Sequence, residues 1–357
     1  MSYAKTLGLA VVAAAVSAVM VAGPADAAGK RVKWKLHSAW GAAVPHLGTS
    51  GVRYAKNIGR MSGGAFSLKF FEPGALVPGN EGFDATSKGS IETAWSTAGY
   101  DVGKYPALAF FTAVPFGPGV GEYFAWKKFG GGDTIQKEIY AKHNIVQMDC
   151  FAIGPETSGW FKNEIKELSQ LRGMKMRFFG LGARVMQKIG VSTQLLAGGD
   201  IFPALEKGVI DATEFSMPTM DIKYGFYQIA KNNYFPGWHQ QTSVSQLLVN
   251  KGKWDSLSDQ NKALLEVGCG DSIHHTYAET EYANPFAMVE MGEKYGVKTR
   301  RWRDDQIAVF EKAWNDVVAE DSAKDPLFKR VSDSYAKFRK AYAKWGTAQS
   351  LKPTYLK

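Results

Sequence analysis

Charged and polar residues follow the ends of several predicted strands in the segment from residue 174 to residue 241. Arg177 and Glu214 each end a predicted strand, and Trp238 and Gln240 lie in a turn rich in Gly, Pro and aromatic residues. In open α/β sheets, small ligands bind at the carboxyl ends of strands. A guanidinium offers a planar fork of donors that matches a carboxylate. The spacing therefore predicts a cleft for a small organic anion.

These residues also have other interpretations. Arg177 can lie at a solvated strand end, and Glu214 can pair with a lysine, because a buried carboxylate is costly without a partner. Two carboxylates such as Glu156 and Glu214 can also perform acid–base chemistry, which makes a periplasmic hydrolase or lyase the alternative to a receptor. A receptor returns its ligand unchanged, whereas an enzyme converts it.

The elements around these residues predict an α/β fold. Strands and helices alternate over residues 32–94 and again over residues 145–214, a pattern typical of sheets covered by helices, and in the first stretch it predicts a parallel sheet. Long helical patterns follow, in which Ser258 can cap the first helix. We expect two lobes that close on a ligand like a hinge. The expected parts are lobe I (28–150), lobe II (151–235), crossing segments with a long bracing helix (236–300) and C-terminal helices (301–357).

The N-terminus reads as a secretory signal peptide. A basic residue, Lys5, precedes an apolar run over residues 7–23, and Ala25-Asp26-Ala27 has the small-x-small pattern of a cleavage site. The apolar run is shorter than the ~20 residues that span a bilayer. We expect residues 1–27 to be removed and the mature chain to lie in the periplasm.

Composition argues against several classes of site. The chain carries a formal net charge of +9, but its Lys and Arg are scattered among acids, so nucleic-acid binding is not expected. The six histidines are dispersed, and metal binding through imidazole is not expected either. Gly180-Leu181-Gly182 lacks the third glycine of a dinucleotide motif. Cys150 and Cys269 can pair or remain buried and free.

Three stretches resemble the solute-binding subunit of TRAP (tripartite ATP-independent periplasmic) transporters. They are Arg177 after an apolar strand, GGDIFPALEKGVIDATE at residues 198–214, and YFPGW at residues 234–238. The similarity runs from about residue 32 into the C-terminal helices. It is greatest to the branch that binds 2-oxo acids and related monocarboxylates with a metal ion. The resemblance implies a two-lobed periplasmic binding protein that delivers a small organic acid to membrane permease subunits, and it leaves a homodimer open.

The resemblance also implies roles for individual residues. Arg177 grips the substrate carboxylate, and Tyr100 lies near the substrate. A cation, Ca²⁺ or Na⁺, takes oxygen ligands from Glu156, Glu214, the Phe215 carbonyl and Gln240. With the aromatic residues at strand ends and turns, the expected substrate-binding set is Arg177, Glu156, Tyr100, Phe178, Phe215 and Trp238. No catalytic residue is expected.

Three positions depart from the family pattern. Glu156 stands where Gln is usual, Gln240 stands where an acid is usual, and Phe215 stands where Trp is common. The first two departures exchange Gln and Glu, which keeps the number of oxygen ligands and the total charge. We therefore expect the cation site to survive with its ligands redistributed.

Overall fold

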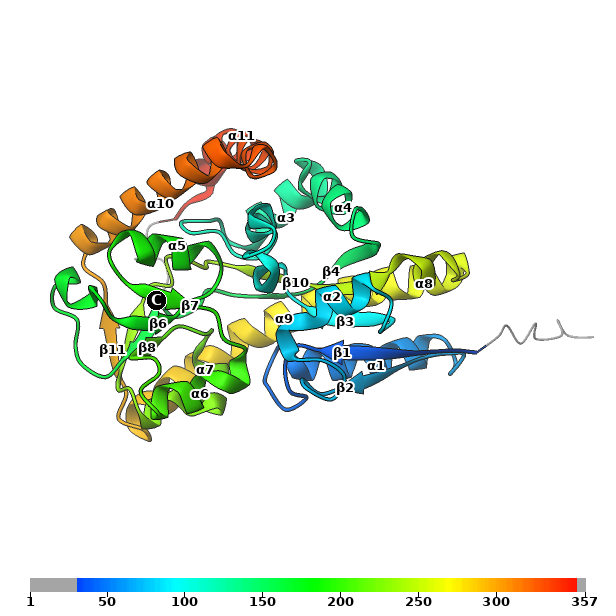
Figure 1. Ribbon diagram of the computed structural model, residues 1–357, viewed down its shortest axis with the longest axis horizontal. Helices are drawn as coiled ribbons and strands as arrows, with labels where there is room; N and C mark the ends of the chain where they lie inside the picture. Colours follow the sequence, from blue (N-terminus) through cyan, green and yellow to red (C-terminus); the bar gives the residue numbers. More distant parts are fainter. Residues whose placement is uncertain (1–30, 352–357) are drawn as a thin grey trace, which may run out of the picture.

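The computed structural model describes residues 31–351, so the predicted signal peptide lies outside the described residues. Figure 1 shows two α/β lobes side by side, each built around one sheet, with long helices packed against them. The predicted two-lobed α/β fold is confirmed. No helix within residues 31–351 is both long and apolar enough to cross a membrane.

The first sheet has five strands in the order β2-β1-β3-β10-β4. The strands are β1 (Val32–Ser38), β2 (Phe66–Phe71), β3 (Thr93–Ser96), β4 (Ile145–Ile153) and β10 (Ser243–Asn250). Its neighbouring helices are α1 (Gly48–Met61), α2 (Gly82–Ser87), α3 (Val120–Phe129) and α4 (Gly132–Ala141).

The three strands between residues 32 and 96 are parallel, as the local alternation predicts, but the complete first sheet is mixed. β1 runs parallel to β2 and β3, but β10 lies antiparallel between β3 and β4. All eight residues of β10 are buried. Its central Gln246 is satisfied, because its side chain accepts from the Ala98 amide and donates to the Phe111 carbonyl, each at 2.9 Å. A strand from a distant part of the chain thus completes the first sheet.

The second sheet has six strands in the order β11-β9-β5-β8-β6-β7. The strands are β5 (Gly159–Phe161), β6 (Lys175–Arg177), β7 (Ser192–Gln194), β8 (Ala212–Thr213), β9 (Asn232–Phe235) and β11 (Lys298–Arg301). Its helices are α5 (Gly180–Lys188), α6 (Gly198–Glu206) and α7 (Pro218–Tyr224). β5 is antiparallel to both β8 and β9, whereas β6 is parallel to β7 and β8.

The remaining helices connect and cover the lobes. They are α8 (Lys251–Asp255), α9 (Asp259–Glu293), α10 (Asp304–Lys324) and α11 (Pro326–Gln349). Short 3₁₀ turns are Gly79–Glu81, Ala98–Asp101, Pro106–Phe111, Leu168–Leu171 and Phe226–Gln228.

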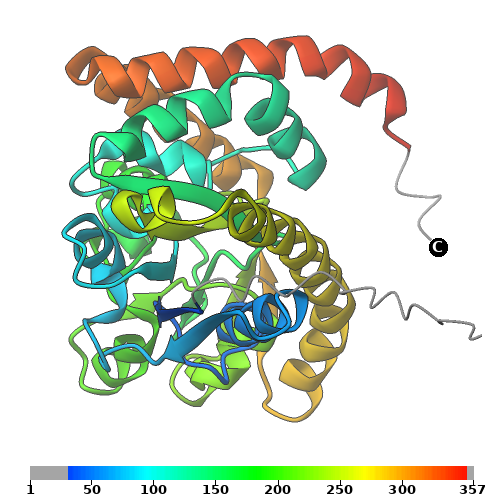
Figure 2. The same cartoon turned by 90° about the vertical axis from the view of Figure 1, so that its right-hand side faces the viewer.

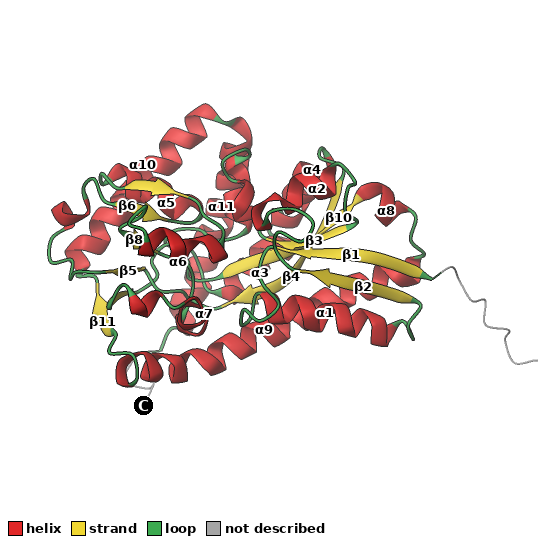
Figure 3. Cartoon of the chain, turned by 60° about the horizontal axis from the view of Figure 1, so that its bottom comes forward, coloured by secondary structure: helices red, strands yellow, loops and turns green. Residues whose placement is uncertain are grey.

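Helix α9 braces the two lobes. Ser258 caps its first turn by accepting from the Asn261 amide at 3.3 Å. The helix packs against β4 and α1 in one lobe and against α7 in the other, and Figure 3 shows it running past both. A disulfide between Cys150 and Cys269 joins β4 to α9, which resolves the pairing that the sequence leaves open.

Candidate ligand and cation site

Four strands of the second sheet bring the site together at one edge. Because β5 runs antiparallel to β8 and β9, its amino end lies beside their carboxyl ends, where Gly159 is paired with Tyr234 and Trp160 with Thr213. Arg177 ends β6 and is paired with Thr213 of β8. The residues that precede β5 therefore lie beside those that follow β8 and β9.

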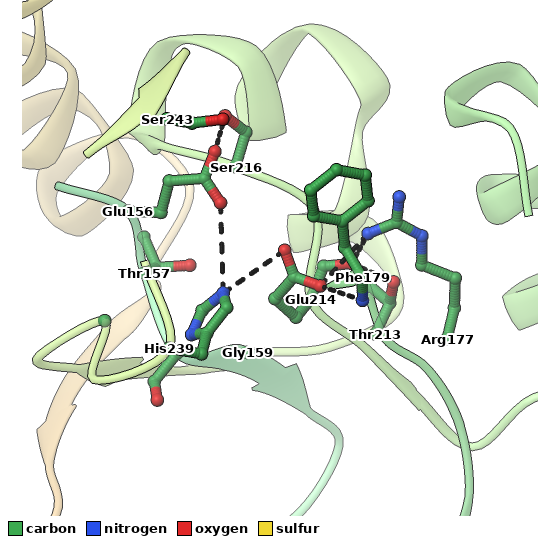
Figure 4. A network of polar contacts seen from close by, with 12 residues as sticks. Glu156, Thr157, Gly159, Arg177, Phe179, Thr213, Glu214, Ser216, His239 and Ser243 are labelled. Atoms are coloured by element: carbon green, nitrogen blue, oxygen red, sulfur yellow. Dashed lines mark hydrogen bonds and ion pairs between the residues drawn. The ribbon is translucent and has the colours of Figure 1, made fainter. Parts of the chain in front are cut away.

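Arg177 is buried and held from several sides. Its Nη1 donates to the Glu214 carbonyl at 2.6 Å and to Glu214 Oε2 at 3.1 Å, while its Nε donates to the Leu196 carbonyl at 3.3 Å. The guanidinium lies 5.2 Å from the ring centre of Phe215 and 5.8 Å from that of Phe179. Among the described residues, no hydrogen bond engages Nη2, and Figure 4 shows this nitrogen without a partner. One edge of the guanidinium is thus available to a ligand.

Glu214 is fully buried and uses its two carboxylate oxygens differently. Oε2 accepts from Arg177 and from the Phe179 amide at 3.0 Å. Oε1 lies 3.4 Å from His239 Nε2 but has no hydrogen-bond partner of acceptable geometry within residues 31–351. Glu214 therefore pairs with an arginine of the site rather than with a lysine, and it retains one unused acceptor.

Glu156 reaches the same place from the segment before β5. Its Oε1 accepts from the Ser216 hydroxyl at 2.7 Å, and its backbone amide donates to the Gln240 carbonyl at 3.2 Å. The turn after β9 lies very close here, since a Cβ on Gly237 would be 2.1 Å from the Glu156 carbonyl oxygen. Only glycine permits this approach, which fixes Gln240 beside Glu156.

His239 is a residue of the site that the sequence analysis did not identify. Its Nε2 lies 3.4 Å from Glu214 Oε1 and 3.9 Å from Glu156 Oε2. Figure 4 shows His239 between the two carboxylates. The three side chains offer ligand atoms that all lie within 4.8 Å of one another. Folding brings His239 to both carboxylates, although its place in the sequence does not by itself indicate this. The one sequence signal for His239 is that it directly precedes Gln240, a predicted ligand of the cation.

A small cavity adjoins these groups. Its walls come from both lobes: Trp40, Leu47, Thr97, Tyr100, Ile153, Glu156, Arg177, Phe179, Phe215, Ser216, Gln240, Ser243 and Ser245. Five of the predicted site residues, Tyr100, Glu156, Arg177, Phe215 and Gln240, are thus part of its lining. Its mixture of aromatic walls and a few polar groups is typical of small-molecule sites.

Phe178 and Trp238 do not line this cavity. Both are buried in the hydrophobic core, with ring centres 6.0 Å apart. They flank His239 at ring-centre distances of 4.9 Å and 5.5 Å. The next residue, Phe179, faces the cavity instead. Phe178 and Trp238 therefore support the imidazole and do not form a wall for the ligand.

Burial and charge act differently on the two carboxyl groups. Burial raises the pKa of Glu156 well above its ordinary value, and the charge of Glu214 raises it further. Burial also opposes the ionisation of Glu214, but the Arg177 guanidinium and His239 outweigh it and hold the pKa of Glu214 below its ordinary value. Glu214 is thus stabilised as a carboxylate by the chain itself, whereas Glu156 lacks an equivalent cationic partner.

The unused acceptors fit a hard cation. Glu156 Oε2, Glu214 Oε1 and Gln240 Oε1 are buried and have no hydrogen-bond partner among the described residues. Unpaired buried acceptors are costly, and carboxylate and amide oxygens are the ligands that Ca²⁺ and similar ions prefer. The donor set of this chain therefore suits such an ion.

Residues 38–325 match the model of the bacterial extracellular solute-binding protein family 7, DctP. The chain belongs to this DctP family. It is a periplasmic solute-binding protein of the TRAP type, as the sequence predicts. Membership of a family of binding proteins also decides against the hydrolase or lyase alternative.

Three DctP-type proteins illustrate the similarity. The monocarboxylate 2-oxoacid-binding periplasmic protein of a Nostoc species is 33% identical over 90% of this chain and 87% of its own length. A solute-binding protein structure from Bordetella bronchiseptica, described as a dimer with calcium and picolinate, is 33% identical. It has a TM-score of 0.86 and covers 89% of this chain and 94% of its own. A structure from Pseudoalteromonas atlantica with bound sodium and pyruvate is 27% identical, with a TM-score of 0.86, and covers 90% of this chain and 100% of its own.

Proposed function

We propose that this chain captures a small organic monocarboxylate, a 2-oxo or 2-hydroxy acid such as pyruvate, and delivers it to TRAP permease subunits. The observation that carries the proposal is the buried cluster of Glu156, Glu214 and His239 beside one cavity, because Arg177 pairs with Glu214 and also lines that cavity. The named ligands of the relatives support the same class of acid.

In this proposal, Arg177 binds the ligand carboxylate and a cation binds beside the carbon that carries the oxo or hydroxyl group. Glu156, Glu214, the Phe215 carbonyl and Gln240 hold the ion, which supplies positive charge for that oxygen. Two glutamates and the ligand carboxylate carry three negative charges against one positive charge on Arg177. A divalent ion such as Ca²⁺ balances this difference, whereas Na⁺ balances half of it.

We assign His239 to the support of the ion's ligands. Ca²⁺ and Na⁺ prefer oxygen, and His239 Nε2 lies near the unused oxygens of both Glu156 and Glu214. Phe178 and Trp238 fix the ring from either side. The imidazole then orients two carboxylates whose charges otherwise repel.

Closure of the two lobes completes the binding step. The cavity takes Trp40, Leu47 and Tyr100 from the lobe of the first sheet, and Arg177 and Phe215 from the lobe of the second. We propose that the lobe of the first sheet and the lobe of the second sheet separate to admit the acid and close over it. A closed form then presents both lobes to the permease.

Calorimetric titration of the purified mature protein tests the proposal. Protein freed of divalent ions with a chelator is titrated with pyruvate in Na⁺-free buffer, and again with Ca²⁺ or with Na⁺ added. Propionate, which keeps the carboxylate but lacks the oxo group, is the matched control. We expect pyruvate to bind best with an ion present, propionate to bind more weakly, and NMR to recover the pyruvate unchanged. If no 2-oxo or 2-hydroxy acid binds with either ion, the proposal fails.

We also infer that the protein assembles as a homodimer. The similar protein from Bordetella bronchiseptica is described as a dimer.

A further inference from the structure

An aromatic ring of the second lobe touches the bare backbone of the first lobe. Gly99 lies in the 3₁₀ turn Ala98–Asp101 after β3, and Phe179 lies between β6 and α5. Figure 2 is viewed from the side of the first lobe, and the green elements of the second lobe lie behind it. A Cβ added to Gly99 would lie 1.9 Å from Cζ of the Phe179 ring, and 2.5 Å and 2.7 Å from its two Cε atoms. The ring thus occupies the space that a side chain at position 99 needs.

The backbone of Gly99 does not itself require glycine. Its φ lies outside the left-handed region, unlike that of Gly180 at the start of α5. A 3₁₀ turn with ordinary φ values accommodates alanine. The reason for glycine at position 99 is therefore the close approach of Phe179 from the other lobe.

The turn that carries Gly99 is firmly held. The Gly99 amide donates to Thr97 Oγ1 at 3.3 Å, and the Ala98 amide donates to the Gln246 side chain at 2.9 Å. Thr97 Oγ1 also lies 2.8 Å from Thr112 Oγ1, and every residue of the turn is buried. A turn that moved away from the ring would break hydrogen bonds of buried groups, which is costly. The first lobe thus offers a rigid surface to the ring.

Phe179 is held from the side of the proposed ligand site. Its amide donates to Glu214 Oε2 at 3.0 Å, a bond drawn in Figure 4. Its ring is perpendicular to the Tyr100 ring at a centre distance of 5.9 Å, and it borders the ligand cavity. A ring pushed off Gly99 into this cavity would take the room of the ligand. Phe179 therefore connects the site around Glu214 to the backbone of the opposite lobe.

We propose that Phe179 and Gly99 form the contact that completes closure of the two lobes over the acid. The inference rests on the proposed function and names the residues at which the closing movement ends. Both are positioning residues, because they set how closely the lobes approach each other. A side chain at position 99 meets the ring before the lobes are fully closed, so the acid and its ion stay less enclosed and are held more weakly.

Calorimetric titration with pyruvate in the presence of Ca²⁺ tests the contact. The proteins are the mature parent, Gly99→Ala, Phe179→Leu and the double variant. Leucine lacks Cζ and both Cε atoms, which are the three atoms nearest to the added Cβ. We expect Gly99→Ala to lower pyruvate affinity by about 10–100-fold in the parent, as overpacking does. In the Phe179→Leu protein the same change should lower it by about twofold or less, because its cause is gone.

Gly103→Ala is the matched control. Gly103 follows the same turn, its φ also lies outside the left-handed region, and a Cβ there would have no atom within 4 Å. This variant should bind pyruvate as the parent does. Equal losses in Gly103→Ala and Gly99→Ala would assign the effect to the turn and overturn the proposed contact.

X-ray scattering in solution separates a closing role from a local one. We expect the parent to contract when pyruvate and Ca²⁺ are added, and Gly99→Ala to stay more extended at saturating pyruvate. The urea midpoint of ligand-free Gly99→Ala should equal that of the parent, because open lobes do not make the contact. A Gly99→Ala protein that contracts fully, or that is less stable without ligand, contradicts the inference.

The outcomes also distinguish this inference from the proposed function. A parent that binds no 2-oxo or 2-hydroxy acid overturns both. A parent that binds pyruvate, together with a Gly99→Ala protein that binds it equally well, overturns the contact alone. A loss of affinity that is the same with Phe179 and with leucine at position 179 does so too.

Discussion

Arg177 and Glu214 form a buried ion pair in which Arg177 Nη1 donates to the side chain and to the backbone carbonyl of the same glutamate. Both side chains are at most 2% exposed. The arginine that is proposed to bind the ligand thus also neutralises a proposed ligand of the cation. Ligand binding and stability depend on the same guanidinium.

Replacing Arg177 should therefore affect folding as well as binding. We expect Arg177→Met to abolish detectable acid binding and to lower the free energy of unfolding by about 3–5 kcal/mol, because it leaves a buried carboxylate unpaired. Urea unfolding and calorimetric titration measure the two effects. Arg177→Met combined with Glu214→Gln should regain part of the stability but no acid binding. Arg53→Met, which breaks a partly exposed pair with Asp271, is the control and should cost about 1 kcal/mol or less.

Relative to the family pattern, Glu and Gln are exchanged between positions 156 and 240. Two substitutions can reverse this exchange. We expect Glu156→Gln to weaken Ca²⁺ binding by about tenfold or more, which corresponds to ~1.4 kcal/mol, because one carboxylate ligand is lost. Adding Gln240→Glu should restore the affinity, since it returns the charge to the same cluster. Calcium titration followed by intrinsic Trp fluorescence measures both. If the double variant binds Ca²⁺ no better than Glu156→Gln alone, the two positions do not share one ion.

The assigned role of His239 predicts a partial effect. We expect His239→Gln to lower Ca²⁺ and pyruvate affinity by about 10–100-fold without abolishing either, because the ring supports the ion's ligands and is not itself an oxygen donor. Tyr295→Phe, a change far along the chain in a surface aromatic pair, is a suitable control. Calcium binding unaffected by His239→Gln contradicts the supporting role.

The disulfide should stabilise the fold without contributing to the site. Cys150 and Cys269 are 119 residues apart in the chain, and their bond joins β4 to α9. We expect the Cys150→Ser, Cys269→Ser variant to lose about 2–5 kcal/mol of unfolding free energy, because the unfolded chain is no longer cross-linked. Its pyruvate affinity at 25 °C should match that of the parent. A large loss of affinity in a fully folded variant is the contrary result.

Asp101 should make the stability of the fold depend on pH. It is not one of the proposed ligands of the ion. Burial raises its pKa from 3.8 to about 7, so the folded state keeps the proton while the unfolded state releases it. Stability is then lost as pH rises from about 4 to about 7, by an amount on the order of 4 kcal/mol. Asp101→Asn cannot ionise, so its advantage over the parent should grow across this range in urea unfolding. Asp316→Asn, at an exposed surface pair, should show no such growth.

Much of this protein follows from the sequence. Arg177 and Glu214 end apolar strands, and such positions gather at one edge of a sheet because parallel strands point the same way. The two-lobed fold follows from alternating strands and helices, and the long C-terminal helices follow from periodic apolar residues. These signals are local, which is why sequence reveals them.

Three features depended on tertiary structure. β10 enters the first sheet from a distant segment, and no local pattern gives its neighbours. His239 lies far along the chain from Glu156, and they meet only because β5 runs antiparallel beside β9. Phe178 and Phe179 are equally plausible in sequence, but adjacent side chains at the end of a strand point to opposite sides. Folding buries Phe178 in the core and turns Phe179 to the cavity, because the packing of the whole sheet decides which side faces the ligand.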